Sequence, residues 1–171
     1  RIEQIVYAED GEVLLRRRRE SHLMPDTTGW AYVFMPDPLS SQGVNYGAPY
    51  IDADDSDVPQ INDQRVLRPL REIEYDPFSQ QFLLEGPYVK LDEIDSPSKT
   101  VVSSTNGEFF FNRSQDGFEQ VNIYFHIDSM QRYIRDKGFT NLVNFPLRVD
   151  AHGFSGADNS AYYPNANSPQ D

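Results

Sequence analysis

One segment of this 171-residue chain has a clear helical repeat, and the other patterned segments are short and strand-like. Between Asp116 and Lys137, apolar residues recur at intervals of three and four, which places them on one side of a helix. Arg135 and Lys137 lie in the last turn, where basic groups favour the helix dipole, and Gly138 suits the position after a helix end. The pattern predicts one long helix over about residues 116–137.

Short segments rich in aromatic and β-branched residues fill residues 64–113 and resume after the predicted helix. Turn signals such as Asn106-Gly107 separate them at intervals of roughly 8–12 residues, which is typical of antiparallel sheets. Phe109 to Phe111 is continuous rather than alternating and predicts a strand buried on both faces. The expected fold class is α+β, with a β-rich antiparallel sheet, one long helix packed on it and long irregular loops.

Composition divides the chain into three parts. Residues 1–20 predict a β-hairpin, with apolar strands on either side of an Asp10-Gly11 turn. Residues 21–65 are dominated by Pro, Gly, Asn, Asp and Ser without a helical period, and they predict an irregular arm interrupted by one aromatic strand at 28–34. Residues 66–171 hold the long helix and the remaining strands.

Charge and cysteine content exclude several function classes. The net charge of −12 argues against nucleic acid and against anionic membranes as partners, because both would repel this surface. The absence of cysteine excludes disulfides, thiolate catalysis and Cys-ligated zinc. The chain has no apolar run of 18 residues, so we expect no transmembrane helix. Its acidic, Lys-poor composition favours a secreted protein, and Arg1 in place of a start methionine indicates a processed or excerpted chain.

The arm contains a candidate calcium loop. Asp52, Asp54 and Asp57 supply closely spaced carboxylates, and hard cations bind several oxygens at once. An EF-hand loop needs glycine where Asp57 stands, and no predicted helices flank the segment. Two interpretations of this segment stay open: a weak calcium site and a solvated acidic loop.

The three histidines do not form a recognisable active site. His126 lies on the predicted helix two residues before Asp128, and side chains two residues apart point to different sides of a helix. This favours a structural histidine packed on the sheet. His152 follows Asp150 on a predicted strand, where the two side chains share a face and predict a His–carboxylate hydrogen bond. His22 lies alone in a loop. The sequence has neither a His-Glu-x-x-His motif nor a serine nucleophile elbow.

Several segments together resemble zinc metallopeptidases of the thermolysin and fungalysin type. Residues 116–139 are similar to the first long helix of these enzymes, and residues 146–152 and 156–164 resemble the strands that follow it. Residues 7–14 resemble the final hairpin of the propeptide, and residues 32–39 the start of the mature domain.

The resemblance implies the N-terminal lobe of such a peptidase, with its propeptide junction, ending before the helix that carries His-Glu-x-x-His. Zinc would belong to the full-length enzyme, with its ligands on the C-terminal catalytic region of the same precursor, and no activity is expected from this chain alone. In the family, an asparagine at the position of Asn159 and the main chain of the next residue, here Ser160, bind an extended peptide substrate at a sheet edge. Tyr162 falls where an aromatic residue lines the cleft, whereas Ala161 departs from the usual bulky aromatic.

A second interpretation comes from a different class. The lobe could be a non-catalytic structural module that assembles outside the cell with identical subunits, through the arm at residues 35–65 and an exposed strand at 157–163. In this interpretation Asn159 is a turn-former beside Asp158.

Overall fold

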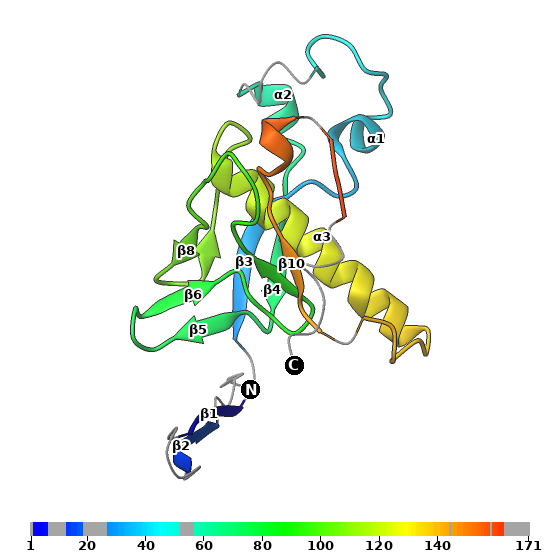
Figure 1. Ribbon diagram of the computed structural model, residues 1–171. Coiled ribbons are helices and arrows are strands. Elements are labelled where there is room, and N and C mark those ends of the chain that lie inside the picture. The colour runs from blue at the N-terminus through cyan, green and yellow to red at the C-terminus, as the bar shows by residue number, and fades with distance from the viewer. Residues whose placement is uncertain are drawn as a thin grey trace.

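One long helix packs against several small sheets in the computed structural model, and the predicted α+β class is confirmed (Figure 1). The N-terminal segment forms the predicted antiparallel hairpin of β1 (Ile2–Val6) and β2 (Val13–Arg18). The structure describes the following ranges, the first two by backbone alone: residues 2–6, 13–18, 27–51, 57–143, 145–157 and 159–162.

The central sheet has β3 (Thr28–Val33) in its middle. β3 pairs antiparallel with β4 (Val66–Arg71) and parallel with the short β9 (Glu108–Phe109). Inward-facing residues of β3 alternate with exposed ones, so that Ala31 and Val33 are buried while Trp30 is half-exposed. This alternation is the period of a strand with one face on the core.

Two further sheets flank this one. β5 (Glu74–Asp76), β6 (Gln81–Leu83) and β8 (Ser103–Ser104) form a three-stranded antiparallel sheet. β7 (Val89–Leu91) pairs in parallel with β10 (Leu147–Val149), which follows the long helix. The strands therefore form several small sheets with mixed pairing, where the sequence predicted one antiparallel sheet.

The Asn106-Gly107 turn signal does not produce a hairpin between the two strands that it separates. β8 and β9 lie on either side of this turn, but β8 pairs with β6 and β9 pairs with β3. The backbone N–H of Trp30 donates to the carbonyl of Gly107 at 2.8 Å, so the turn itself is tied to the central sheet. A turn signal fixes a local chain reversal, whereas the partner of each strand depends on distant segments.

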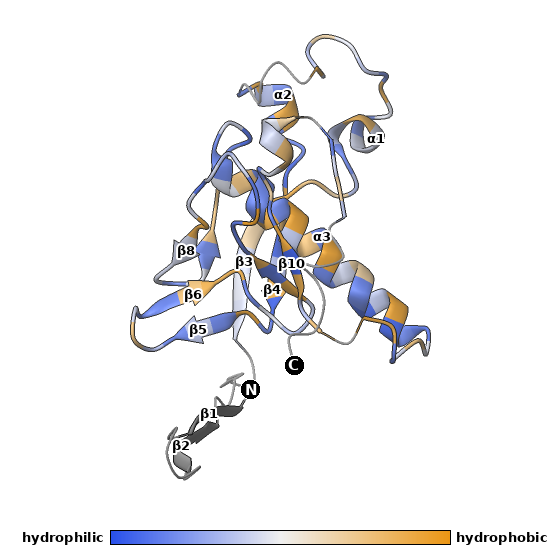
Figure 2. Cartoon of the chain, in the orientation of Figure 1, coloured by the Kyte–Doolittle hydropathy of each residue, from blue (hydrophilic) through white to orange (hydrophobic). Residues whose placement is uncertain are grey.

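The long helix α3 (Asp116–Asp136) matches the prediction to within one residue. Its buried side packs on β3 and β7, and apolar residues also appear on its outer side toward the C-terminal end (Figure 2). In the described part of the chain, no helix has both the length and the apolar character needed to cross a membrane. The core between helix and sheets consists of Ala31, Val33, Leu70, Ile73, Leu84, Val89, Leu91, Phe109, Val121, Tyr124 and Phe125.

The arm is less irregular than predicted, because it contains α1 (Pro38–Gln42) and α2 (Pro59–Asn62). Asp37 caps α1 by accepting the backbone N–H of Ser40 at 2.9 Å, and Gly43 ends it with a left-handed φ of +64°. Each helix is about one turn long, which is too short to give an apolar period in the sequence.

Candidate functional site

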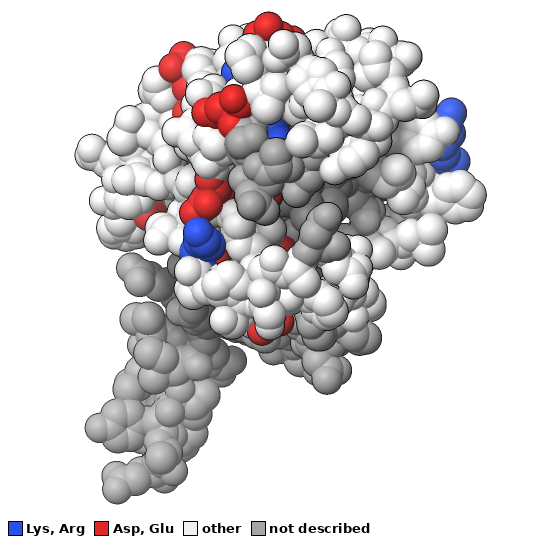
Figure 3. All heavy atoms as spheres, turned by 90° about the horizontal axis from the view of Figure 1, so that it is seen from above, with Lys and Arg blue, Asp and Glu red and all other residues white. Residues whose placement is uncertain are grey.

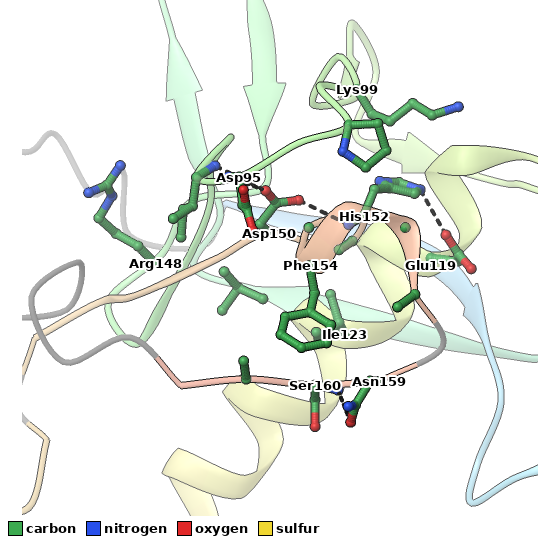
Figure 4. Close-up of a pocket in the computed structure, with 18 of the residues that line it drawn as sticks. Asp95, Lys99, Glu119, Ile123, Arg148, Asp150, His152, Phe154, Asn159 and Ser160 are labelled. Carbon is green, nitrogen blue, oxygen red and sulfur yellow. Dashed lines mark hydrogen bonds and ion pairs between the residues drawn. The ribbon is translucent and has the colours of Figure 1, made fainter.

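A cavity of about 770 Å³ lies between α3, β10 and the segment that follows β10 (Figure 4). Ile123 and Ile127 of α3, together with Phe154, supply apolar lining. Glu119 and His152 supply polar groups beside them. A concave site that combines apolar side chains with convergent polar groups is a default candidate for a ligand-binding site.

Asp150 anchors the segment after β10. Its carboxylate accepts the backbone N–H groups of Ile94 and Asp95, each at 3.0 Å, and that of His152 at 2.9 Å. Partial burial raises the pKa of Asp150, but the three backbone donors outweigh this effect and hold the pKa below its ordinary value. Asp150 therefore fastens β10 and the following turn to the loop at residues 94–95.

The next residues form a strained left-handed turn. Phe154, Ser155 and Gly156 have φ values of 57°, 58° and 69°, which are unfavourable for the two residues that carry a side chain. The Ser155 N–H donates to the Ser96 carbonyl at 2.7 Å and holds the turn in place. Strained backbone that is fixed by its surroundings is frequent at functional sites. Here the turn directs the chain into the segment that borders the cavity.

All three residues predicted to bind substrate line this cavity. Asn159, Ser160 and Tyr162 lie in the exposed segment 159–162. No described strand pairs with this segment, so the strand predicted here is not paired within the described ranges. The Asn159 side chain accepts the Ser160 N–H at 2.8 Å, an arrangement that is also expected of a turn-former.

The histidine contact differs from the one that the sequence predicts. His152 approaches Asp150 through its backbone N–H, and its imidazole points to α3 instead, with Nε2 2.7 Å from the Glu119 carboxylate. The two atoms are close enough for an ion pair but are not aligned as a hydrogen bond. Glu119 lies far away in the sequence and in a different element, so no local pattern could have identified it.

Neither metal is supported by the described residues. No group of three His, Asp or Glu side chains within them is placed to hold a metal ion. His126 Nε2 lies 2.9 Å from the Phe34 carbonyl, as a structural histidine would, and His22 lies outside the described ranges. The prediction that the zinc ligands lie on a C-terminal region of the precursor is not tested by the described residues, and we derive no step through zinc.

Only one of the three calcium candidates can be placed. The Asp57 carboxylate accepts hydrogen bonds from Asn62 Nδ2 at 2.9 Å and from Ser114 Oγ at 2.8 Å, and these bonds lower the pKa of Asp57. Asp57 thereby ties the arm to the residues before α3. Asp52 and Asp54 lie outside the described residues.

The chain carries more acidic than basic residues, 27 against 15. Figure 3 shows acidic side chains distributed over the end of the molecule that carries α1 and α2, with the basic side chains separated from one another. At the cavity, Asp116 pairs with Lys99 at 3.0 Å, and Arg148 pairs with Asp92 at 2.8 Å.

Comparison with protein-family models, with curated proteins and with solved structures found no match.

The Asp150 contacts predict a pH-dependent stability. We expect Asp150→Asn to lower the free energy of unfolding by about 2 kcal/mol at pH 7, because the amide cannot replace a charged acceptor of three N–H groups. The folded pKa lies below that of the unfolded chain, about 3.9, so the stabilisation is present above that pH and is lost as the pH falls through the folded pKa. Urea titrations at pH 7 and below pH 4 should therefore give a difference between wild type and variant that shrinks in acid. An equal difference at both pH values would contradict this role for the carboxylate.

Proposed function

We propose that this chain is the substrate-binding N-terminal lobe of a secreted zinc metallopeptidase, whose zinc ligands lie on a C-terminal catalytic region outside these 171 residues. One observation carries the proposal: residues 159–162 form an exposed segment that borders the cavity and has no strand partner among the described residues. This segment holds Asn159 and Ser160, the two positions to which the sequence resemblance assigns substrate binding.

The proposed binding mode is strand addition. A peptide in extended form would lie along residues 159–162 and exchange main-chain hydrogen bonds with them. Alternate side chains of a strand point to opposite faces, so every second side chain of the peptide would turn toward the cavity. The apolar lining from Ile123, Ile127 and Phe154 favours apolar side chains at that position.

The first test is made on the native protein. Intact mass and peptide mapping should show peptides that continue past Asp171 into a His-Glu-x-x-His segment, and the purified protein should contain zinc and cleave peptides. A native mass close to the 19.7 kDa of this sequence would contradict the proposal.

Substitution of one side chain tests whether residues 159–162 bind substrate. In the native peptidase, we expect Asn159→Ala to lower kcat/KM by about tenfold, the equivalent of one hydrogen bond of roughly 1–1.5 kcal/mol. Asn141→Ala is a matched control, because Asn141 is exposed and does not line the cavity. The assignment fails if the two variants have the same kcat/KM.

A structural module is the second candidate, and the same segment favours it. An unpaired extended segment can pair with another copy of the chain, and large apolar side chains such as Phe78 and Tyr46 are exposed. This candidate predicts a native polypeptide near 19.7 kDa whose sedimentation mass is a multiple of that value. The mass experiment above therefore separates the two functions.

A further inference from the structure

Three contacts hold the segment that follows β10. This segment leads to residues 159–162, which we call the proposed substrate-binding edge. The Asp150 carboxylate and the Ser155 N–H attach it to the loop at residues 94–96. The third contact joins His152 to Glu119, which lies in the first turn of α3 (Figure 4). The first two contacts fix the segment to one side of the cavity, and the third fixes it to the helix on the other side.

His152 is placed to hold the segment after β10 against α3. Its side chain is only 10% exposed, and its Nε2 has no aligned hydrogen-bond partner and lies within 2.7 Å of the Glu119 carboxylate. The carboxylate is more accessible, with 39% of its side chain exposed. A buried imidazole that faces a carboxylate forms an ion pair while it is protonated and loses the charge attraction when it is neutral.

We propose that His152 is a positioning residue, which ties residues 152–157 to α3 through Glu119 and so fixes residues 159–162, the proposed substrate-binding edge, beside the cavity. The inference rests on the proposed function for its effect on substrate, while the tie itself can be measured without substrate. The left-handed turn at Phe154–Gly156 makes the tie effective, because a strained turn relaxes when one of its anchors is released.

Other charged groups surround the pair. On α3, Asp116 lies one turn from Glu119 and is paired with Lys99 from the facing loop. Asp150, on the same segment as His152, is held by backbone donors, and Asp95 lies on the loop beside it. Glu119 is the carboxylate at ion-pair distance from the imidazole, so we assign the pH response of the tie to this pair.

The tie is tested by amide hydrogen exchange in the full chain. The amides of Ser155, Gly156 and Ala157 are hydrogen-bonded and report on the turn. We expect His152→Gln and Glu119→Gln each to speed their exchange roughly tenfold at pH 5.5, with no further increase in the double variant. Amides of α3 at residues 121–125 should not change. Lys99→Gln removes the neighbouring ion pair and should leave the turn amides as in wild type.

The pH profile separates a charge-dependent tie from simple packing. The ratio of exchange rates between Glu119→Gln and wild type should be larger at pH 5.5 than at pH 8, because the charge attraction between an imidazole and a carboxylate exists only while the imidazole is protonated. A ratio that is constant with pH, or turn amides that do not respond to either substitution, would overturn the proposal.

Substrate kinetics distinguish this inference from the proposed function. In the native peptidase, loss of the tie should raise KM for a peptide several-fold more than it lowers kcat, because the edge binds substrate and carries no reacting group. If exchange responds as expected but the native protein cleaves no peptide, the tie stands and the proposed function fails. If the peptidase is active and exchange does not respond, the proposed function stands and the tie fails.

Discussion

Replacing Arg132 with methionine is expected to lower the free energy of unfolding by about 3 kcal/mol, near the lower end of the range for breaking a buried ion pair. Arg132 Nε donates to Asp128 at 2.8 Å, and its Nη1 donates to Glu72 at 2.7 Å. The Asp128 side chain is only 8% exposed, while that of Arg132 is 20% exposed. Methionine keeps much of the side-chain volume but leaves the Asp128 carboxylate buried without its cation.

The same variant should gain stability in acid. Burial raises the pKa of Asp128 even with Arg132 in place, and removing the guanidinium raises this pKa further. Because the folded pKa then lies above the unfolded value of about 3.9, the folded state takes up the proton first, and stability increases as the pH falls through the folded pKa. Urea unfolding at pH 7 and pH 4.5 should show that the deficit of Arg132→Met shrinks at the lower pH.

Arg135→Met is the matched control. Arg135 lies over the ring of Tyr88 at 5.4 Å, as Arg132 does at 5.1 Å, but it donates to the exposed carbonyl of Thr140 rather than to a buried carboxylate. We expect a loss of at most about 1 kcal/mol. Equal losses in the two variants would show that the cation–π contact, not the Asp128 pair, stabilises this end of α3.

The second large effect concerns neighbouring phenylalanines. Phe109 is 1% exposed in the core, whereas Phe110 is 46% exposed and contacts Tyr32 with ring centroids 5.1 Å apart. We expect Phe109→Ala to cost about 3–5 kcal/mol, from lost burial and the cavity that remains. Phe110→Ala should cost about 1 kcal/mol, the value of one aromatic contact. Chemical denaturation of the two variants measures the difference, and similar losses would contradict the assigned orientation of β9.

This pair also shows where a sequence pattern is insufficient. The continuous apolar segment Phe109 to Phe111 predicted burial on both faces, but β9 is covered on one face only. Phe110 points away from the core and finds Tyr32 of the neighbouring strand, which shields it in part. An apolar run indicates which residues can be buried. Which of them are buried in the fold depends on how many layers of structure cover the strand.

Substrate binding by the predicted residues stays a prediction. The sequence resemblance selected Asn159, Ser160 and Tyr162, and the structure places all three beside one cavity. No sequence pattern indicated that Glu119 faces His152, and strand periodicity assigned the imidazole to Asp150. The prediction from strand periodicity was wrong because the chain turns directly after β10, so Asp150 and His152 no longer share a strand face.

The sequence by itself determined the long helix, the N-terminal hairpin and the α+β class, because periodicity and turn residues act over a few neighbouring residues. Only the tertiary structure decided which strands pair, that Asp57 joins the arm to Ser114, and that Glu119 faces His152. These contacts join segments that are distant in the chain, and their geometry depends on how the sheets and α3 pack together. Local residue patterns do not specify that packing. The cavity and the contacts that hold its bordering segment are therefore visible only in the folded chain.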